Sequence, residues 1–190
     1  MRRLLIMAFV LMLGASVALA ADPPGGKIGM FADQAGTNCS ITDTAPGLLP
    51  IYVVHIVDAG ATAIQYIAAK PACMTSTYLS DTNPFGVTIG NSQTGVSVGY
   101  GTCRSGAIHC QTISYFASGT TPACCVYTVH CDPLGVDQCA SGLVDIVDCD
   151  FGTGLAKGRS GVINQNASCD CATVPVEETS WGQIKSLYDE

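Results

Sequence analysis

The eleven cysteines of this chain constrain its fold more than any other feature, because they follow an export signal. The chain begins with Arg2 and Arg3, continues with an apolar run over residues 4–13, and then shows a small-residue pattern at residues 18–20. These are the three parts of a secretory signal peptide, which we assign to residues 1–20. Exported cysteines meet an oxidising environment, so we expect disulfide bonds throughout the mature chain.

All eleven cysteines lie in the mature chain, residues 21–190, so at least one thiol lacks a partner within it. Cys139 is the candidate for the unpaired thiol. The other ten are disulfide candidates: Cys39, Cys73, Cys103, Cys110, Cys124, Cys125, Cys131, Cys149, Cys169 and Cys171. Four or five bridges, each adding roughly 2–4 kcal/mol, would exceed the net stability of a typical domain.

Position along the chain suggests some pairings. Cys39 and Cys73 are the only cysteines of the first half, so we predict a bond between them. Adjacent residues on a strand point to opposite faces, so Cys124 and Cys125 should bond different partners. In one workable scheme Cys103 bonds one of these two. Cys149 would then bond one of the two cysteines at positions 169 and 171.

Short apolar segments between turn residues predict an all-β domain over residues 21–174. Residues 51–57 form the most apolar run and read as a central strand buried on both faces. A turn at 58–60 leads to a second strand over 61–69. Residues 95–101 alternate apolar and small side chains, as a half-exposed strand does. Residues 74–84 and 152–161 read as loops.

The segments 107–116 and 123–131 read as a hairpin, whose register would set Cys110 opposite Cys131 for a disulfide. In all we count about nine strands. This predicts a disulfide-stapled antiparallel β-sandwich, immunoglobulin-like or similar.

Residues 175–190 differ from the rest and predict one short amphipathic helix. Four side chains would share its apolar face: Trp181, Ile184, Leu187 and Tyr188. So short a helix is unstable alone in water, so this face must dock. Docking on its own sandwich is the favoured interpretation, and an anchoring tag read by other machinery is the alternative.

The charge balance excludes several partners. Removal of Arg2 and Arg3 leaves six basic residues against fifteen acidic ones, a formal net charge near −9. Nucleic acids and anionic membranes require clustered Lys and Arg, so neither is expected. The mature chain has no second long apolar run, so no transmembrane segment is predicted. We expect a secreted, cell-surface or periplasmic protein, and its oligomeric state stays open.

Histidines and aspartates give the candidate metal ligands. In the predicted hairpin His109 faces Asp132 and lies diagonal to His130, which could form a zinc site. A solvated strand face is the favoured interpretation. His55 lies in the central strand and reads as a hydrogen-bonded core histidine.

A calcium site is a weaker alternative. It would use Asp145, Asp148 and Asp150, with Asp132 and Asp137 nearby, but their spacing does not match an EF-hand loop. No nucleophile elbow, phosphate loop or Cys-x-x-Cys motif is present. We therefore predict no catalytic residue and no cofactor.

Several segments together resemble a group of exported bacterial proteins of uncharacterised activity. The similarity covers nearly all of the mature chain and rests on these stretches: IGMFAD, YVVH, YLSD, FGVTIGNSQTGVSVGYGTC, ACCVY, VDIVDCDF and WGQIKSLY. The resemblance implies a secreted, cysteine-rich β domain with a C-terminal W-G-x-I-K-x-L-Y segment. It implies no reaction.

Export, disulfides, strands and the lack of catalytic motifs favour a non-enzymatic structural or adhesive module at a cell surface or in the extracellular space. Its partners would be cell-surface, matrix or glycan components. A carbohydrate-binding module is the alternative, weakened because the only Trp lies in the terminal helix. A secreted hydrolase is the third hypothesis.

Overall fold

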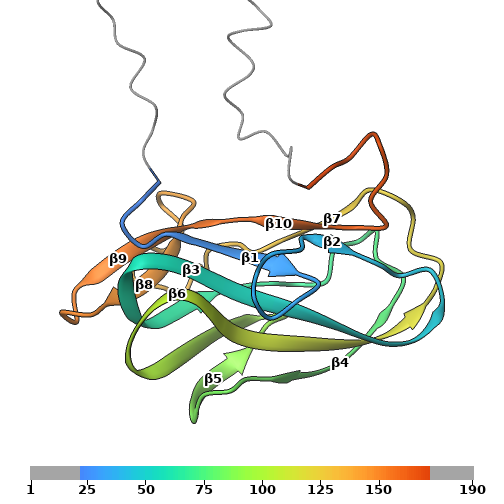
Figure 1. The fold of residues 1–190 in the computed structure, drawn as a ribbon. Coiled ribbons are helices and arrows are strands. Elements are labelled where there is room, and N and C mark those ends of the chain that lie inside the picture. Colours follow the sequence, from blue (N-terminus) through green and yellow to red (C-terminus); the bar gives the residue numbers. More distant parts are fainter. Residues whose placement is uncertain (1–21, 172–190) are drawn as a thin grey trace, which may run out of the picture.

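The computed structural model describes residues 22–171, which contain ten β-strands and no helix (Figure 1). The strands are β1 (Lys27–Phe31), β2 (Ser40–Ile41), β3 (Pro46–Tyr66), β4 (Thr77–Thr82), β5 (Val87–Asn91), β6 (Gly95–Ser118), β7 (Cys125–Thr128), β8 (Val144–Asp148), β9 (Thr153–Gly158) and β10 (Ser160–Ile163). They form one seven-stranded and one three-stranded sheet. The predicted signal peptide and the predicted helix at 175–190 lie outside the described residues. An all-β fold is confirmed, with ten strands rather than about nine.

β3 and β6 are long antiparallel partners that form the frame of the domain. Each continues through a segment where the sequence predicts a break between two strands. Their register is irregular between Val57 and Ala61, and β6 has glycines with positive φ at Gly101 and Gly106. Figure 1 shows the paired ribbon turning back on itself here. The two halves of the ribbon therefore lie in different layers.

The other strands add to one half of this ribbon or the other. β1 pairs with the first half of β3 and β8 with its second half. β4 pairs with β6 at Thr112–Phe116, whereas β5 pairs with it at Gly95–Gly99. Two pairings, β1–β9 and β2–β10, are parallel, so the predicted wholly antiparallel arrangement is wrong in these places. The sequence predicts loops over β4 and β9, whose polar and glycine-rich residues hide their strand character.

The core lies between the two halves of the ribbon and under the small sheet. The predicted alternation in β6 is confirmed, because Val96, Val98 and Tyr100 are all buried. His55 is also buried, as predicted. Its Nε2 donates to the Gly25 carbonyl at 2.6 Å and its Nδ1 accepts from the Tyr100 hydroxyl at 3.0 Å, in the tautomer that satisfies both contacts. Burial lowers the pKa of His55 below the usual 6.5, with the Gly25 contact opposing the shift.

Five disulfides cross-link the described residues. The bonded pairs are Cys39–Cys171, Cys73–Cys125, Cys103–Cys149, Cys124–Cys169 and Cys131–Cys139. The prediction that Cys124 and Cys125 bond different partners is confirmed, although Cys124 lies in the turn before β7, with a φ of 64°, rather than on a strand. The other pairings predicted from sequence are wrong, because strands distant in sequence bring these cysteines together.

Cys39 lies beside β2, which pairs with β10, so its partner comes from the end of the described chain rather than from Cys73. Cys103 and Cys149 meet at the bend of the β3–β6 ribbon, where Gly60 has a φ of 90°. A Cβ on Gly60 would lie 2.6 Å from the Cys149 sulfur. Only glycine fits against this disulfide.

The predicted hairpin between 107–116 and 123–131 is wrong. β6 already has β3 on one edge and β4 on the other, so no edge is free for β7. β7 instead pairs with β10 in the small sheet. Buried Asp43 holds this crossover, because its carboxylate accepts bonds from the Gly119 amide and the Thr121 hydroxyl.

Two cysteine assignments change as a consequence. Cys110 lies at a bulge, skipped between the pairs formed by Gln111 and His109, and its thiol points into the core. It is the free thiol, fully buried, and burial raises its pKa to about 12. The prediction of a free Cys139 and of a Cys110–Cys131 bond is wrong.

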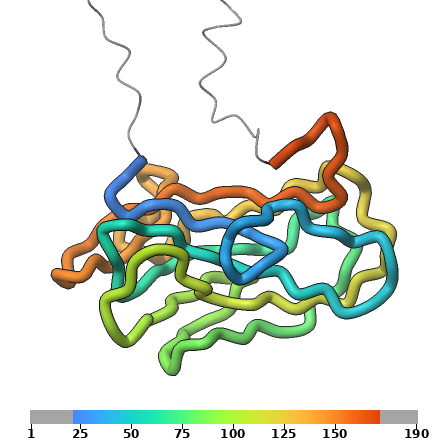
Figure 2. The backbone as a smooth tube through the Cα atoms, viewed as in Figure 1, coloured from blue at the N-terminus to red at the C-terminus, as the bar shows by residue number. Residues whose placement is uncertain are grey.

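The two ends of the described chain lie on the same side of the molecule (Figure 2). Residue 22 leads into β1, and residue 171 is tied by its disulfide to Cys39. The opposite side carries the bend of β6 and the connection between β4 and β5 (Figure 1).

Candidate functional site

The clearest candidate site is a pocket of about 400 Å³ at the bend of β6. It is lined by Pro84, Phe85, Arg104, Ser105, Ala107, Ile108 and His109. β4 and β5 pair with opposite halves of β6, so the connection between them must cross the bend. That crossing places Pro84 and Phe85 against a segment twenty residues later in the chain.

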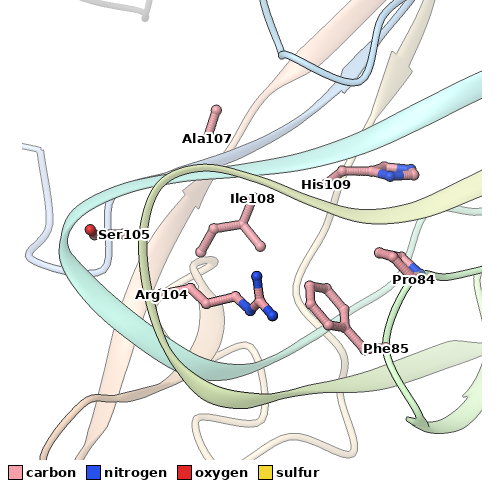
Figure 3. Close-up of a pocket in the computed structure, with 7 residues that line it drawn as sticks. All are labelled: Pro84, Phe85, Arg104, Ser105, Ala107, Ile108 and His109. Carbon is pink, nitrogen blue, oxygen red and sulfur yellow. The ribbon is translucent and has the colours of Figure 1, made fainter.

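Arg104 and Phe85 form the centre of this pocket, which we call the Arg104 pocket. The Arg104 guanidinium carbon lies 5.0 Å from the centre of the Phe85 ring, a cation–π contact. Figure 3 shows Arg104, Ile108 and Phe85 within the curve of β6, with Arg104 turned towards Phe85. The Phe85 ring also lies 5.0 Å from the Tyr100 ring. Because Tyr100 is buried in the core, this stack fixes the cation on a rigid support.

The charge around Arg104 is unusual for so acidic a chain. None of the seven lining residues is acidic. Among the residues that the structure describes, no carboxylate pairs with Arg104, whereas Lys27 is held by Asp22 at 2.5 Å. The donor groups of this guanidinium, which match a carboxylate in geometry, therefore stay available.

His109 also lines the Arg104 pocket and is its second titratable side chain. Its Nε2 lies 2.9 Å from the Thr112 hydroxyl, and its ring meets the Tyr52 ring edge to face at 5.5 Å. Burial is the main cause that lowers the pKa of His109 below 6.5, with a hydrogen bond to the Gln111 backbone opposing it. His109 is therefore neutral at pH 7 and gains charge only on acidification.

The predicted metal ligands do not meet. His109 lies on β6, whereas His130 follows β7 and bridges to Ile67. Asp132 is buried, and its carboxylate accepts from the Gln65 side-chain amide and the Leu134 backbone amide, both at 2.9 Å. Across residues 22–171, no three His, Cys, Asp or Glu side chains gather as a metal site. The zinc cluster depended on the hairpin register, which is wrong.

Two of the aspartates considered for calcium, Asp145 and Asp148, accept hydrogen bonds from backbone amides. Asp145 accepts from the Asp137 amide, and Asp148 accepts from the amides of Asp150 and Gly152. Their oxygens are turned towards backbone N–H groups rather than towards a common centre. The predicted docking residues of the helix at 175–190 lie outside the described part of the chain.

Sequence reasoning missed the Arg104 pocket. Its residues come from two segments whose contact depends on the bend of β6. The only signal was that Arg104 directly follows Cys103 in a chain with six mature basic residues. The Cys103–Cys149 disulfide restricts the backbone at the bend, and therefore also the backbone of the adjacent Arg104.

Comparison with known proteins identifies no family. No protein-family model matches the sequence, and no curated protein does. Within residues 22–171 there is also no helix long and apolar enough to cross a membrane.

Cohesin modules are among the solved structures to which this chain is similar. A non-cellulosomal cohesin from Archaeoglobus fulgidus has 10% identity over 75% of this chain and 91% of its own, with a TM-score of 0.49. A cohesin module from a Clostridium perfringens family 33 glycoside hydrolase has 6% identity over 76% of this chain and 98% of its own, with a TM-score of 0.45. The sixth cohesin of Acetivibrio cellulolyticus scaffoldin B, solved with a dockerin, has 12% identity over 74% of this chain and 98% of its own, with a TM-score of 0.42.

Proposed function

We propose that this protein is an exported, non-enzymatic adhesive module that binds carboxylate groups of a protein partner in the Arg104 pocket. The observation that supports this most is a single one. A guanidinium without an acidic partner is stacked on an aromatic ring, in a pocket without acidic residues, on a predicted mature chain with a net charge near −9.

The fixed position of Arg104 supports binding. An Arg side chain loses about 2 kcal/mol of rotamer entropy when it is immobilised, and here the stack on Phe85 has already restricted it. Ile108 and Pro84 also line the pocket, so apolar side chains lie next to the place where a carboxylate would meet the guanidinium.

A protein carboxylate fits this pocket better than a sugar. Sugar-binding platforms present an open aromatic face, whereas the Phe85 ring has Arg104 over one face and packs against Tyr100. An Asp or Glu side chain needs only the guanidinium and an apolar rim. The carbohydrate-binding alternative therefore has no specific support at this pocket.

Five disulfides fit an adhesive role outside the cell, where a domain must stay folded without chaperones. They also hold the elements that shape the pocket, since Cys103 directly precedes Arg104. We place the module at the cell surface or in the extracellular matrix.

The test is calorimetric titration of the mature protein with a short glutamate peptide, with the equivalent glutamine peptide as ligand control. The net negative charge of the protein opposes non-specific binding of the glutamate peptide, so binding would indicate a specific site. We expect Arg104→Gln to weaken binding roughly tenfold or more, the value of a charge-assisted pair.

Arg159→Gln is the matched control, because Arg159 is also an exposed arginine but lies after β9, outside the pocket. It should bind like the unmodified protein. Absence of glutamate binding, or equal binding by Arg104→Gln, would overturn the proposal. Arg104-dependent binding of a uronic-acid oligosaccharide without peptide binding would establish the carbohydrate alternative instead.

A further inference from the structure

A second surface contrasts with the Arg104 pocket in shape and in charge. Residues 131–139 form a loop closed by the Cys131–Cys139 disulfide, and we call it the 131–139 loop. Its backbone is tied inward, because the Leu134 amide donates to the Asp132 carboxylate at 2.9 Å and the Gly135 amide to the Asp132 carbonyl at 2.9 Å. The Asp137 amide donates to the Asp145 carboxylate at 3.1 and 3.2 Å. The loop therefore has a fixed shape.

This rigid loop presents two large aliphatic side chains to solvent. Leu134 is 85% exposed and Val136 is 73% exposed. One exposed aliphatic residue is ordinary, but two on a covalently closed loop form a preordered apolar projection. Binding through such a loop loses little conformational entropy, because the disulfide has already restricted it.

The loop has no basic residue and contains two aspartates, Asp132 and Asp137. Asp132 is buried and accepts hydrogen bonds from Gln65 and Leu134, so Asp137 is the acidic side chain that the loop presents. Asp137 lies within the loop, and hydrogen bonds from Ser141 to its carboxylate lower its pKa below 3.8. The loop thus combines two exposed aliphatic side chains with the carboxylate of Asp137, a group that the Arg104 guanidinium could bind.

From this complementarity we infer that the 131–139 loop of one molecule docks in the Arg104 pocket of a second copy. Leu134 or Val136 would pack against Phe85 and Ile108, and an adjacent carboxylate would meet the Arg104 guanidinium. The inference rests on the proposed function, because it names the protein that supplies the carboxylate.

Such a contact is head-to-tail. The pocket and the loop are different surfaces and share no residue, so each molecule can use both at once. A heterologous contact of this kind extends into chains or closes into rings. The module would then contribute to an extracellular assembly by binding copies of itself.

The expected affinity is modest. A single loop in a pocket buries less than the roughly 1,200 Å² of a standard interface, so we expect a Kd on the order of 10 µM to 1 mM. Repulsion between molecules of net charge near −9 is screened beyond about 8 Å at physiological ionic strength, so it does not prevent this local contact.

The test uses two variants of the mature protein, each with one surface disabled. The pocket variant is Arg104→Gln, and the loop variant is Leu134→Ser with Val136→Ser. Both change exposed side chains, so folding should be preserved. In sedimentation velocity up to roughly 1 mM, the range set by the expected affinity, the unmodified protein should form oligomers and each variant alone should stay monomeric.

An equimolar mixture of the two variants should form heterodimers and nothing larger, because only one complementary pair of surfaces remains. The control Leu48→Ser removes an exposed aliphatic residue of β3 that belongs to neither surface, and should associate like the unmodified protein. A monomeric unmodified protein, or a mixture without heterodimers, would overturn the inference. If self-association is absent but the loop variant still binds the glutamate peptide, the proposed function stands without this inference. If the loop variant does not bind the peptide either, the proposed function and the inference both fail.

Discussion

The Arg104 pocket and the 131–139 loop belong to one small acidic domain, yet they differ in shape, charge and origin. The pocket is concave, lacks acidic residues and is assembled from two segments that meet at a bend of β6. The loop is convex and acidic, and is closed within nine residues by a covalent bond. Overall charge therefore says little about what each surface can bind.

The two regions also differ in what stabilises them. The pocket depends on long-range strand pairing, because β4 and β5 must bind opposite halves of β6 to bring Phe85 to Arg104. The loop depends on its own disulfide and on two buried carboxylates that accept its backbone amides, those of Asp132 within the loop and Asp145 outside it. Changes that disturb one region should leave the other intact.

Opening the loop should have the largest effect. We expect Cys131→Ser with Cys139→Ser to lower the free energy of unfolding by roughly 2–3 kcal/mol, because a short closed loop no longer restricts the unfolded chain. Self-association should also be lost, because the free loop must be ordered on binding. Urea unfolding and sedimentation velocity measure the two effects.

Binding of the glutamate peptide is the internal control for this variant, since its pocket is unchanged. If peptide binding fell together with self-association, the pocket and the loop would not be structurally independent, contrary to our expectation.

Substitution of two phenylalanines by alanine tests whether the ring that packs in the pocket contributes more to stability than an exposed ring. Phe85→Ala should lower the unfolding free energy by about 2 kcal/mol, a value reduced from that of a fully buried ring, because Phe85 is only partly buried. It should also weaken glutamate binding by freeing Arg104. Phe151 is 81% exposed in the β8–β9 turn, so Phe151→Ala should change stability by less than about 0.5 kcal/mol. Equal effects of the two changes on urea unfolding would contradict the structure of the pocket.

Acidity should act on the pocket before it acts on the loop. His109 is neutral at pH 7 because its pKa lies below 6.5. Protonation at lower pH adds a positive charge to the lining of the Arg104 pocket, so glutamate binding should strengthen roughly threefold to tenfold between about pH 7.5 and 5, a range in which glutamate stays ionised. Titration calorimetry across this range measures it.

His109→Gln should remove this pH dependence and leave binding at pH 7.5 nearly unchanged. The sign for stability is opposite. A histidine with a lowered pKa in the folded state binds more protons when unfolded, so its contribution to stability is present above pH 6.5 and lost as the pH falls. Stronger binding in acid despite weaker folding would therefore assign the effect to the pocket.

The last prediction concerns Cys110, the free cysteine, and it is expected to have the smallest effect. A thiol with a pKa of about 12 in the core is almost wholly protonated at pH 8 and should resist alkylation in the native protein. After denaturation without reductant, mass spectrometry should find one alkylated cysteine, at position 110. Alkylation of Cys139 instead would show that the Cys131–Cys139 disulfide, on which the 131–139 loop depends, is absent.

The sequence by itself determined the all-β class, several strands, the buried His55 and the different disulfide partners of Cys124 and Cys125. These features follow from local rules, namely apolar content, alternation along a strand and the geometry of adjacent residues. Such rules act over a few residues and need no knowledge of distant neighbours.

Only the tertiary structure decided the disulfide partners, the free Cys110 and the Arg104 pocket. Each depends on which strand occupies which sheet edge. β4 fills the edge of β6 that a hairpin would have used, so β7 crosses to the small sheet and the predicted metal cluster is dispersed. Edge occupancy is settled by competition among all strands for backbone hydrogen bonds, and no short stretch of sequence encodes its outcome.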